Sequence, residues 1–187
     1  MDLINTSTSR STQYGCDEPL LNRVLTPYKP HCRYLTAATV TRQGEPRDGG
    51  RVSARGEFTI PESCYIDDTG HFNAVEFNLC FNQLVYYLLA KSVKERAMWP
   101  FDAWTLDEYW ARQLPDILIV DFRSTFRRAM RGRGFWGEID VVGVDEREGD
   151  DGSIVLVSTL CRYGEGDAPT CHGGVRLAVR TTKNDAA

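Results

Sequence analysis

A polar, ionisable stretch directly precedes the longest apolar segment of the chain, and it holds the residue types that acyl-transfer chemistry requires. Residues 62–73 read Glu-Ser-Cys-Tyr-Ile-Asp-Asp-Thr-Gly-His-Phe-Asn. Near neutral pH, an imidazole such as that of His71 can take a proton from water or from an ammonium group. A phenol such as that of Tyr65 can help to hold a developing oxyanion, and Glu62 adds a carboxylate. This stretch is therefore the first candidate for an active site.

The segment that follows, Asn73 to Leu89, predicts a long helix that is buried on almost every side. Asn73 is a capping residue, and Glu76 at the third helical position completes a capping box. The first N–H groups of such a helix lack partners within the helix and carry partial positive charge. A thioester carbonyl placed there, beside Gly70 and Ala74, would have its oxyanion or enolate stabilised. We expect Gly70 to allow a close approach of the backbone.

The remaining segments predict mostly strands. A short helix is expected over residues 17–25 and another from Thr105, while strands are expected over 31–41, 51–60, 117–128, 135–145, 154–163 and 175–182. Consecutive strands with one enveloped helix predict an α+β fold, with an antiparallel sheet of about six strands wrapped around that helix. The length of 187 residues favours one domain, which we place at residues 16–183 after a flexible polar tail over residues 1–15.

Composition and charge exclude several classes of protein. A net charge of −4 argues against nucleic-acid binding. The polar N-terminus lacks the apolar region of a signal peptide, and no run of about 18 apolar residues predicts a membrane span. No two of the six cysteines form a CxxC pair, so reduced thiols in a cytoplasmic protein are expected. The pair Cys171-His172 offers too few ligands for a metal site, and we expect neither metal nor cofactor.

Several short motifs carry a resemblance to one family. They are Thr-Pro-Tyr at 26–28, Cys-Arg-Tyr-Leu at 32–35, Phe-Thr-Ile at 58–60, Glu-Ser at 62–63, Tyr-Ile at 65–66, Thr-Gly-His-Phe-Asn-Ala-Val-Glu at 69–76 and Cys-Phe-Asn-Gln at 80–83. The chain resembles the FcoT-type acyl thioesterases, which include the (2E)-enoyl-[acyl-carrier-protein] glycyltransferases of isonitrile lipopeptide and β-amino acid polyketide pathways. The resemblance implies a hot-dog fold, a homodimer or an assembly of dimers, and fatty acyl thioesters of acyl carrier protein or CoA as substrates.

The resemblance also implies site residues. The proposed active-site positions of the family match Tyr28, Tyr65 and Asn82, with Asn73 nearby. To these we add Arg33, in the second motif, as a substrate contact. The loop over residues 44–50 looks longer than the family pattern, which puts the local edge of the sheet in doubt rather than the site.

Each of these residues also has a purely structural interpretation. His71 is either a base or a side chain that fixes its loop by hydrogen bonds, and Asn73 is either a substrate contact or only a helix cap. The amide of Asn82 must find a partner in the backbone or in a substrate. Both tyrosines can be core aromatics with one polar tip, and Glu62 can lie on a solvated loop. Asp67 resembles the catalytic Asp of the 4-hydroxybenzoyl-CoA type of hot-dog thioesterase, a position that the FcoT-type pattern does not keep acidic.

The densest basic cluster lies in the second half of the chain and consists of Arg123, Arg127, Arg128, Arg131 and Arg133. It is either a solvated strand edge or a docking site for CoA phosphates or an acidic carrier protein. Arginine suits the second role because its guanidinium group makes bidentate contacts with phosphate. We assign docking to Arg123, Arg127 and Arg128.

Three functions remain open at this stage. In the first, glycine adds to the β-carbon of a 2-enoyl fatty acyl thioester, and water then releases an N-carboxymethyl-3-amino fatty acid. The enolate and the later tetrahedral oxyanion would share the helix N-terminus, with help from Tyr65 or Asn82. The second is hydrolysis of a medium- or long-chain acyl-CoA or acyl-carrier thioester. The third is a non-catalytic acyl-binding module, which would not need buried Tyr, His and Asn together.

Overall fold

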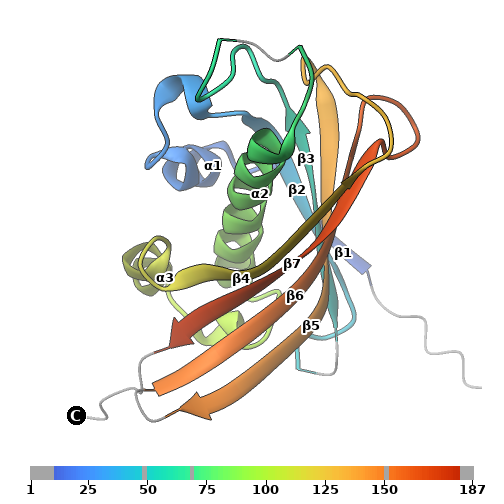
Figure 1. The fold of residues 1–187 in the computed structure, drawn as a ribbon. Coiled ribbons are helices and arrows are strands. Elements are labelled where there is room, and N and C mark those ends of the chain that lie inside the picture. Colours follow the sequence, from blue (N-terminus) through green and yellow to red (C-terminus); the bar gives the residue numbers. More distant parts are fainter. Residues whose placement is uncertain (1–10, 48–49, 68–69, 150–151, 182–187) are drawn as a thin grey trace, which may run out of the picture.

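Helix α2 (Ala74–Glu95) is the centre around which the rest of the chain is arranged (Figure 1). The computed structural model describes residues 11–47, 50–67, 70–149 and 152–181. A seven-stranded antiparallel sheet curves around one side of α2, and the shorter helices lie on its other side. This confirms the predicted α+β class and the hot-dog arrangement of a sheet wrapped around a buried helix.

The strands follow the predicted order with different ends. They are β1 (Ser11–Tyr14), β2 (Leu35–Gln43), β3 (Arg51–Phe58), β4 (Ile117–Phe126), β5 (Phe135–Gly149), β6 (Gly152–Gly164) and β7 (Cys171–Thr181). Their order in the sheet is β1-β2-β3-β5-β6-β7-β4, so that β1 and β4 form the two edges. The chain thus places β4, which comes soon after α2, at the edge farthest from β1.

Two predictions at the N-terminal end are wrong. Residues 11–14 pair with β2 as an edge strand, although they were expected in a flexible tail over residues 1–15. The sheet therefore has one strand more than the six expected. The second strand starts at Leu35 rather than His31, because Pro30–Cys32 forms the short 3₁₀ helix η1. Residues 1–10 and 182–183 of the expected boundaries lie outside the described residues.

The three other helical segments lie beside α2. Helix α1 (Glu18–Leu25) begins at the predicted cap Asp17, and α3 (Leu106–Arg112) begins at the predicted cap Thr105. The 3₁₀ helix η2 (Phe101–Ala103) precedes α3. No helix within the described ranges has the length and apolar character needed to cross a membrane.

Helix α2 continues six residues beyond the predicted end at Leu89, through a segment that carries charge. Lys91 is buried there, and its ammonium group lies 2.9 Å from Glu95 and 3.5 Å from Asp17. Asp17 also accepts a hydrogen bond from Lys94. Because a buried charge is tolerated only when it is paired, Glu95 of the same helix and Asp17, which is far away in the sequence, together stabilise this extension.

An aromatic cluster joins the start of α2 to the sheet. The ring centroids of Phe77 and Tyr163 are 4.8 Å apart, and those of Phe72 and Phe135 are 5.0 Å apart. Phe58 stacks on Phe135 at 5.2 Å. Edge-to-face and offset pairs of this kind favour a defined geometry in addition to burying area. The helix N-terminus is therefore held firmly where the candidate site lies.

A single buried amide connects the middle of α2 to the segment between α1 and β2. Gln83 is fully buried, and its Oε1 accepts hydrogen bonds from the backbone N–H groups of Tyr34 and Leu35, both at 2.9 Å. Its Nε2 donates to the carbonyl of Cys32 at 2.6 Å. Three backbone groups of this segment are thus satisfied from inside the helix.

The Gln83→Leu variant tests how much this amide contributes. We expect the free energy of unfolding to fall by about 3 kcal/mol or more, since each buried polar group left unpaired costs about 1–3 kcal/mol. Urea unfolding followed by circular dichroism measures the change. The control is Gln13→Leu on the exposed side of β1, which should change stability by about 0.5 kcal/mol or less. Equal stability of the two variants would contradict this role.

Candidate active site

The start of α2 is closed by a capping box that also holds the preceding loop. The Asn73 side chain accepts a hydrogen bond from the N–H of Val75 at 2.8 Å, and Glu76 accepts from the N–H of Asn73 at 3.0 Å. The hydroxyl of Ser63 donates to the other oxygen of the Glu76 carboxylate at 2.9 Å. Glu76 is only 2% exposed. The cap thus pairs the N–H groups of Val75 and Glu76, whereas that of Ala74 has no acceptor among the described residues.

Tyr65 is held against this cap. The Nδ2 group of Asn73 donates to the Tyr65 hydroxyl at 2.9 Å, and the Tyr65 side chain is 50% exposed. Because the phenol oxygen accepts this bond, its own proton remains free to donate to another oxygen. The structural and functional interpretations of Asn73 are therefore compatible, since one side chain both caps the helix and orients a phenol donor.

An open depression of about 450 Å³ lies at the same end of α2. Its walls come from the helix start and from the chain after β4, and its lining residues are His71, Phe72, Asn73, Ala74, Phe126, Arg127, Arg128 and Ala129. Neither Arg127 nor Arg128 forms an ion pair within the described part of the chain. The fold thus brings two uncompensated guanidinium groups to the predicted thioester site, across about 50 positions of sequence.

A small crevice of about 20 Å³ lies next to this depression, and it is large enough for a single water molecule. It is lined by Glu62, Ser63, His71, Glu76, Arg131 and neighbouring backbone. His71 lines both cavities and therefore lies where they adjoin. Glu62 is exposed, and its carbonyl accepts a hydrogen bond from the Tyr34 hydroxyl at 3.0 Å.

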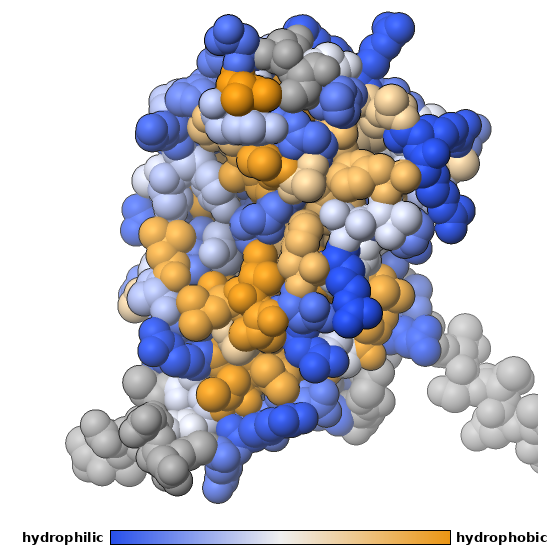
Figure 2. Space-filling view, in the orientation of Figure 1, coloured by the Kyte–Doolittle hydropathy of each residue, from blue (hydrophilic) through white to orange (hydrophobic). Residues whose placement is uncertain are grey.

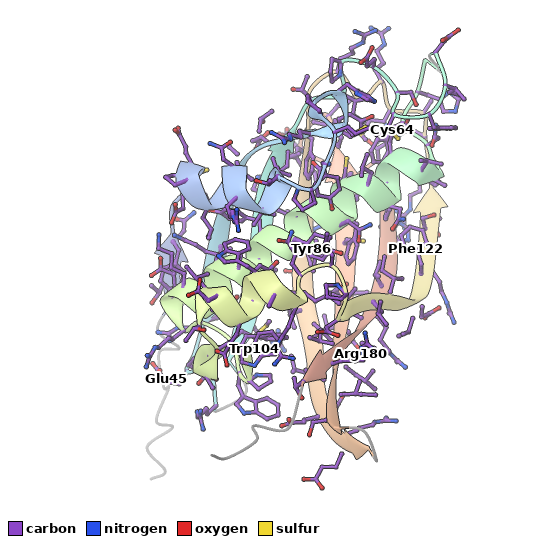
Figure 3. All side chains as sticks on the ribbon, turned by 90° about the vertical axis from the view of Figure 1, so that its left-hand side faces the viewer. Glu45, Cys64, Tyr86, Trp104, Phe122 and Arg180 are labelled. Carbon is purple, nitrogen blue, oxygen red and sulfur yellow. The ribbon has the colours of Figure 1, made fainter. Side chains whose placement is uncertain are left out.

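A second polar group lies near the middle of α2. Burial raises the pKa of Tyr28, and the nearby Tyr86 and Cys80 raise it further. Burial also raises the pKa of Tyr86, so both phenols keep their protons as donors near neutral pH. Figure 3 shows Tyr86 in the middle of α2, on the face between α1 and α3, and Cys64 in the loop at the helix N-terminus. Asn82 lies one helical turn before Tyr86, on the same face.

The two groups do not converge on one atom within a single chain. Asn82 follows the cap Asn73 by nine residues, which corresponds to about 14 Å along the helix axis. Asn82 is therefore farther along the helix from its start than Tyr65, and its help with the same oxyanion stays a prediction. Tyr65 and the helix start form one end of the candidate site, and Asn82 lies farther along the helix from this end.

Three predicted residues have other surroundings than expected. Arg33 donates to the backbone carbonyls of Tyr28 and Thr26, at 3.1 and 3.4 Å, so it fixes the segment that carries Tyr28 instead of contacting the site. Gly70 has a φ of +70° with nothing within 4 Å of an added Cβ, so the left-handed turn and not a close approach requires glycine. Arg123 is 83% exposed beside Asp121 and does not line the depression.

Sequence reasoning missed Ser63, Tyr86 and Phe126 as parts of the site. Tyr86 had a local signal, since it follows Asn82 by four residues and therefore shares its helix face. Ser63 belongs to the Glu-Ser motif at 62–63, whereas Phe126 had no such signal, because its place depends on how β4 packs against the helix start.

Comparison with known proteins identifies a family. The model of the FcoT-like thioesterase domain family matches residues 23–179. A (2E)-enoyl-[ACP] glycyltransferase of Streptomyces coeruleorubidus is 53% identical over 163 residues, which are 87% of this chain and 96% of that protein. A protein of the same name from Mycobacterium marinum is 43% identical over 163 residues, with 87% and 85% covered.

Among solved structures, a thioesterase candidate from Syntrophus aciditrophicus SB superposes with a TM-score of 0.49 and 14% identity, over 87% of this chain and 95% of that chain. The family match covers the central helix, the capping loop, strands β2 to β6 and all but the last two residues of β7. This chain belongs to the FcoT-like thioesterase domain family.

Proposed function

We propose that this protein adds glycine to the β-carbon of a 2-enoyl fatty acyl thioester and then hydrolyses the thioester to release an N-carboxymethyl-3-amino fatty acid. The observation that carries the proposal is the Tyr65 hydroxyl held at 2.9 Å by Asn73, beside an open depression with two arginines that form no ion pair with any described residue. Family membership and relatives named (2E)-enoyl-[ACP] glycyltransferase support the same chemistry.

The thioester carbonyl would lie at the helix start. The Tyr65 hydroxyl and the Ala74 N–H are the donors available there, and the positive end of the α2 dipole adds to them. All three favour a negatively charged oxygen over a neutral carbonyl, which is the requirement for catalysis. The phosphate of a carrier-bound or CoA-bound arm would be held by Arg127 and Arg128 on the opposite wall.

His71 is the proposed base. It takes a proton from the glycine ammonium, and the amine nitrogen then forms a bond to the β-carbon of the enoyl group. The electrons of the C=C bond move toward the carbonyl, which becomes an enolate held at the helix start. The proton on His71 returns to the α-carbon, which regenerates the thioester and leaves the enzyme unchanged.

Hydrolysis would use the same oxyanion donors. A water in the crevice beside Glu62 and His71 attacks the carbonyl carbon while one of these groups takes its proton. The C–S bond of the tetrahedral intermediate then breaks, and the thiol leaves with a proton. A single oxyanion site can thus serve both steps.

Self-association is also part of the proposal. Strand β4 is an edge strand, and an edge offers unpaired backbone groups to a second chain. Leu118, Val120 and Phe126 on this strand are 40 to 55% exposed. Figure 2 shows apolar side chains down the middle of the face on which β4 and α2 lie in Figure 1. These features support edge-to-edge pairing of two copies.

The direct test is a mass measurement on the products. The protein is incubated with a medium-chain 2-enoyl thioester, with and without glycine. We expect a glycine-dependent mass gain on the thioester, followed by the corresponding free acid. Free enoic acid formed equally well without glycine would make the protein a simple thioesterase, and no product in either case would leave an acyl-binding module.

The Tyr65→Phe variant tests the oxyanion donor. We expect kcat to fall about 100-fold or more, since the loss of one such donor typically has this effect. Tyr14→Phe, which removes a hydroxyl from β1, is the control and should keep the wild-type rate. Asn73→Asp separates the two roles of Asn73, because aspartate caps helices but has no N–H donor. An unchanged rate in Tyr65→Phe, with thermal melting showing a folded protein, would reject the assignment.

Replacing both Arg127 and Arg128 by alanine tests the docking role. We expect KM for the thioester to rise about tenfold, with a weaker dependence of KM on salt, and kcat to stay within about twofold. Arg147→Ala, at the far end of β5, controls for the loss of positive charge. If KM changes as much in this control, the effect is one of net charge and not of docking.

A further inference from the structure

Asn78 carries a polar atom that the fold leaves without a partner. Its Oδ1 is buried from solvent, yet it accepts no hydrogen bond from any described residue. Buried polar side-chain atoms are nearly always paired, so an exception needs an explanation. A helix can replace an interior asparagine by a better helix former at no cost to packing, which makes a retained, unpaired amide a candidate for binding.

The position of Asn78 on α2 is distinctive. From Glu76 to Val93 every residue of the helix is buried except four, which are Asn78, Leu79, Asn82 and Tyr86. Asn78, Asn82 and Tyr86 follow each other at intervals of four residues and therefore lie on one face. The first helical residue, Ala74, continues this row into the depression. This row of residues, which we call the track, thus begins beside the oxyanion donors and is less completely buried than the rest of the helix.

The first step along this track matches the spacing of the reacting atoms. Asn78 lies one helical turn beyond Ala74, about 6 Å along the axis. In an enoyl thioester whose carbonyl oxygen lies at the helix start, the β-carbon is two bonds farther along than the carbonyl carbon. The nucleophile approaches that β-carbon, so its nitrogen comes to lie at about the same position along the helix axis as Asn78.

We infer that Asn78 is a glycine-binding residue, whose amide oxygen accepts a hydrogen bond from the amine of glycine as that amine approaches the β-carbon. The inference rests on the proposed function and names the part of the site that selects the nucleophile. An acceptor suits this place, because the amine carries N–H groups throughout the reaction. Asn82, one turn farther along, has N–H donors that suit the glycine carboxylate.

The assignment predicts that replacing Asn78 changes the KM for glycine and leaves the constants for the thioester nearly unchanged. Leucine matches asparagine in size but cannot form hydrogen bonds, so Asn78→Leu should raise KM for glycine about tenfold. The KM for the thioester and the glycine-independent rate of hydrolysis should stay within about twofold, because the oxyanion donors are untouched. Mass spectrometry of both products at varied glycine concentration gives all three values.

Asn22→Leu is the matched control, since Asn22 is an exposed asparagine of another helix, α1, and this variant should behave as the wild type. Asn78→Asp keeps an acceptor oxygen and loses the N–H donors, so we expect its KM for glycine to stay within about threefold. Thermal melting of each variant shows whether it is folded.

The outcomes separate the two proposals. If the wild type gives no glycine adduct, the proposed function fails. If the wild type forms the adduct but Asn78→Leu keeps the wild-type KM for glycine, only the role of Asn78 is overturned. Equal loss in Asn78→Asp and Asn78→Leu would overturn the acceptor role, since it would show that the amide acts through its N–H groups.

Discussion

The amide of Gln83 lies in the middle of an otherwise apolar helix and makes three hydrogen bonds to the chain around η1 and the start of β2. These bonds fix the backbone of Tyr34, whose hydroxyl in turn holds the carbonyl of Glu62. The loop that carries Tyr65 begins there and is tied again where Ser63 meets Glu76. The placement of the phenol donor therefore depends on a polar group buried two helical turns beyond the helix start.

Two side-chain amides of α2, those of Gln83 and Asn78, differ in how their hydrogen bonds are satisfied. An amide removed from water needs partners, and an unpaired one costs about 1–3 kcal/mol. Gln83 faces the protein and makes hydrogen bonds to three backbone groups, so its burial stabilises the fold. The Oδ1 of Asn78 is buried and finds none among the described residues, which leaves one acceptor of this helix without a protein donor. Satisfied amides fix the structure of this helix, and an unsatisfied one indicates where a substrate would bind.

The arginines of this protein also fall into two sets, one paired with carboxylates on the sheet and one that lines the depression. The acidic chain pairs several of its arginines closely, as where Glu138 lies 2.6 Å from both Arg55 and Arg162 on the sheet. Arg127 and Arg128 have no such carboxylate within the described ranges and line the depression instead. An arginine already paired with a carboxylate has little left to offer a phosphate. The local absence of compensation, and not the net charge of −4, is what suits this surface to an anionic carrier.

Most elements of the fold and the residues at the start of the site were predictable from the sequence, because their signals are local. A capping box spans four residues, apolar periodicity marks a buried helix, and the block around His71 carries the family resemblance. Tertiary structure alone decided that residues 11–14 join the sheet and that Arg33 holds the segment that carries Tyr28. It also decided which arginines line the depression, namely Arg127 and Arg128 but not Arg123. It also decided that Asn82 lies about 14 Å from the cap while Asn78 lies between them without a partner. The physical reason is that hydrogen bonds and cavities join groups tens of residues apart, so no pattern within one turn of helix or one strand contains them.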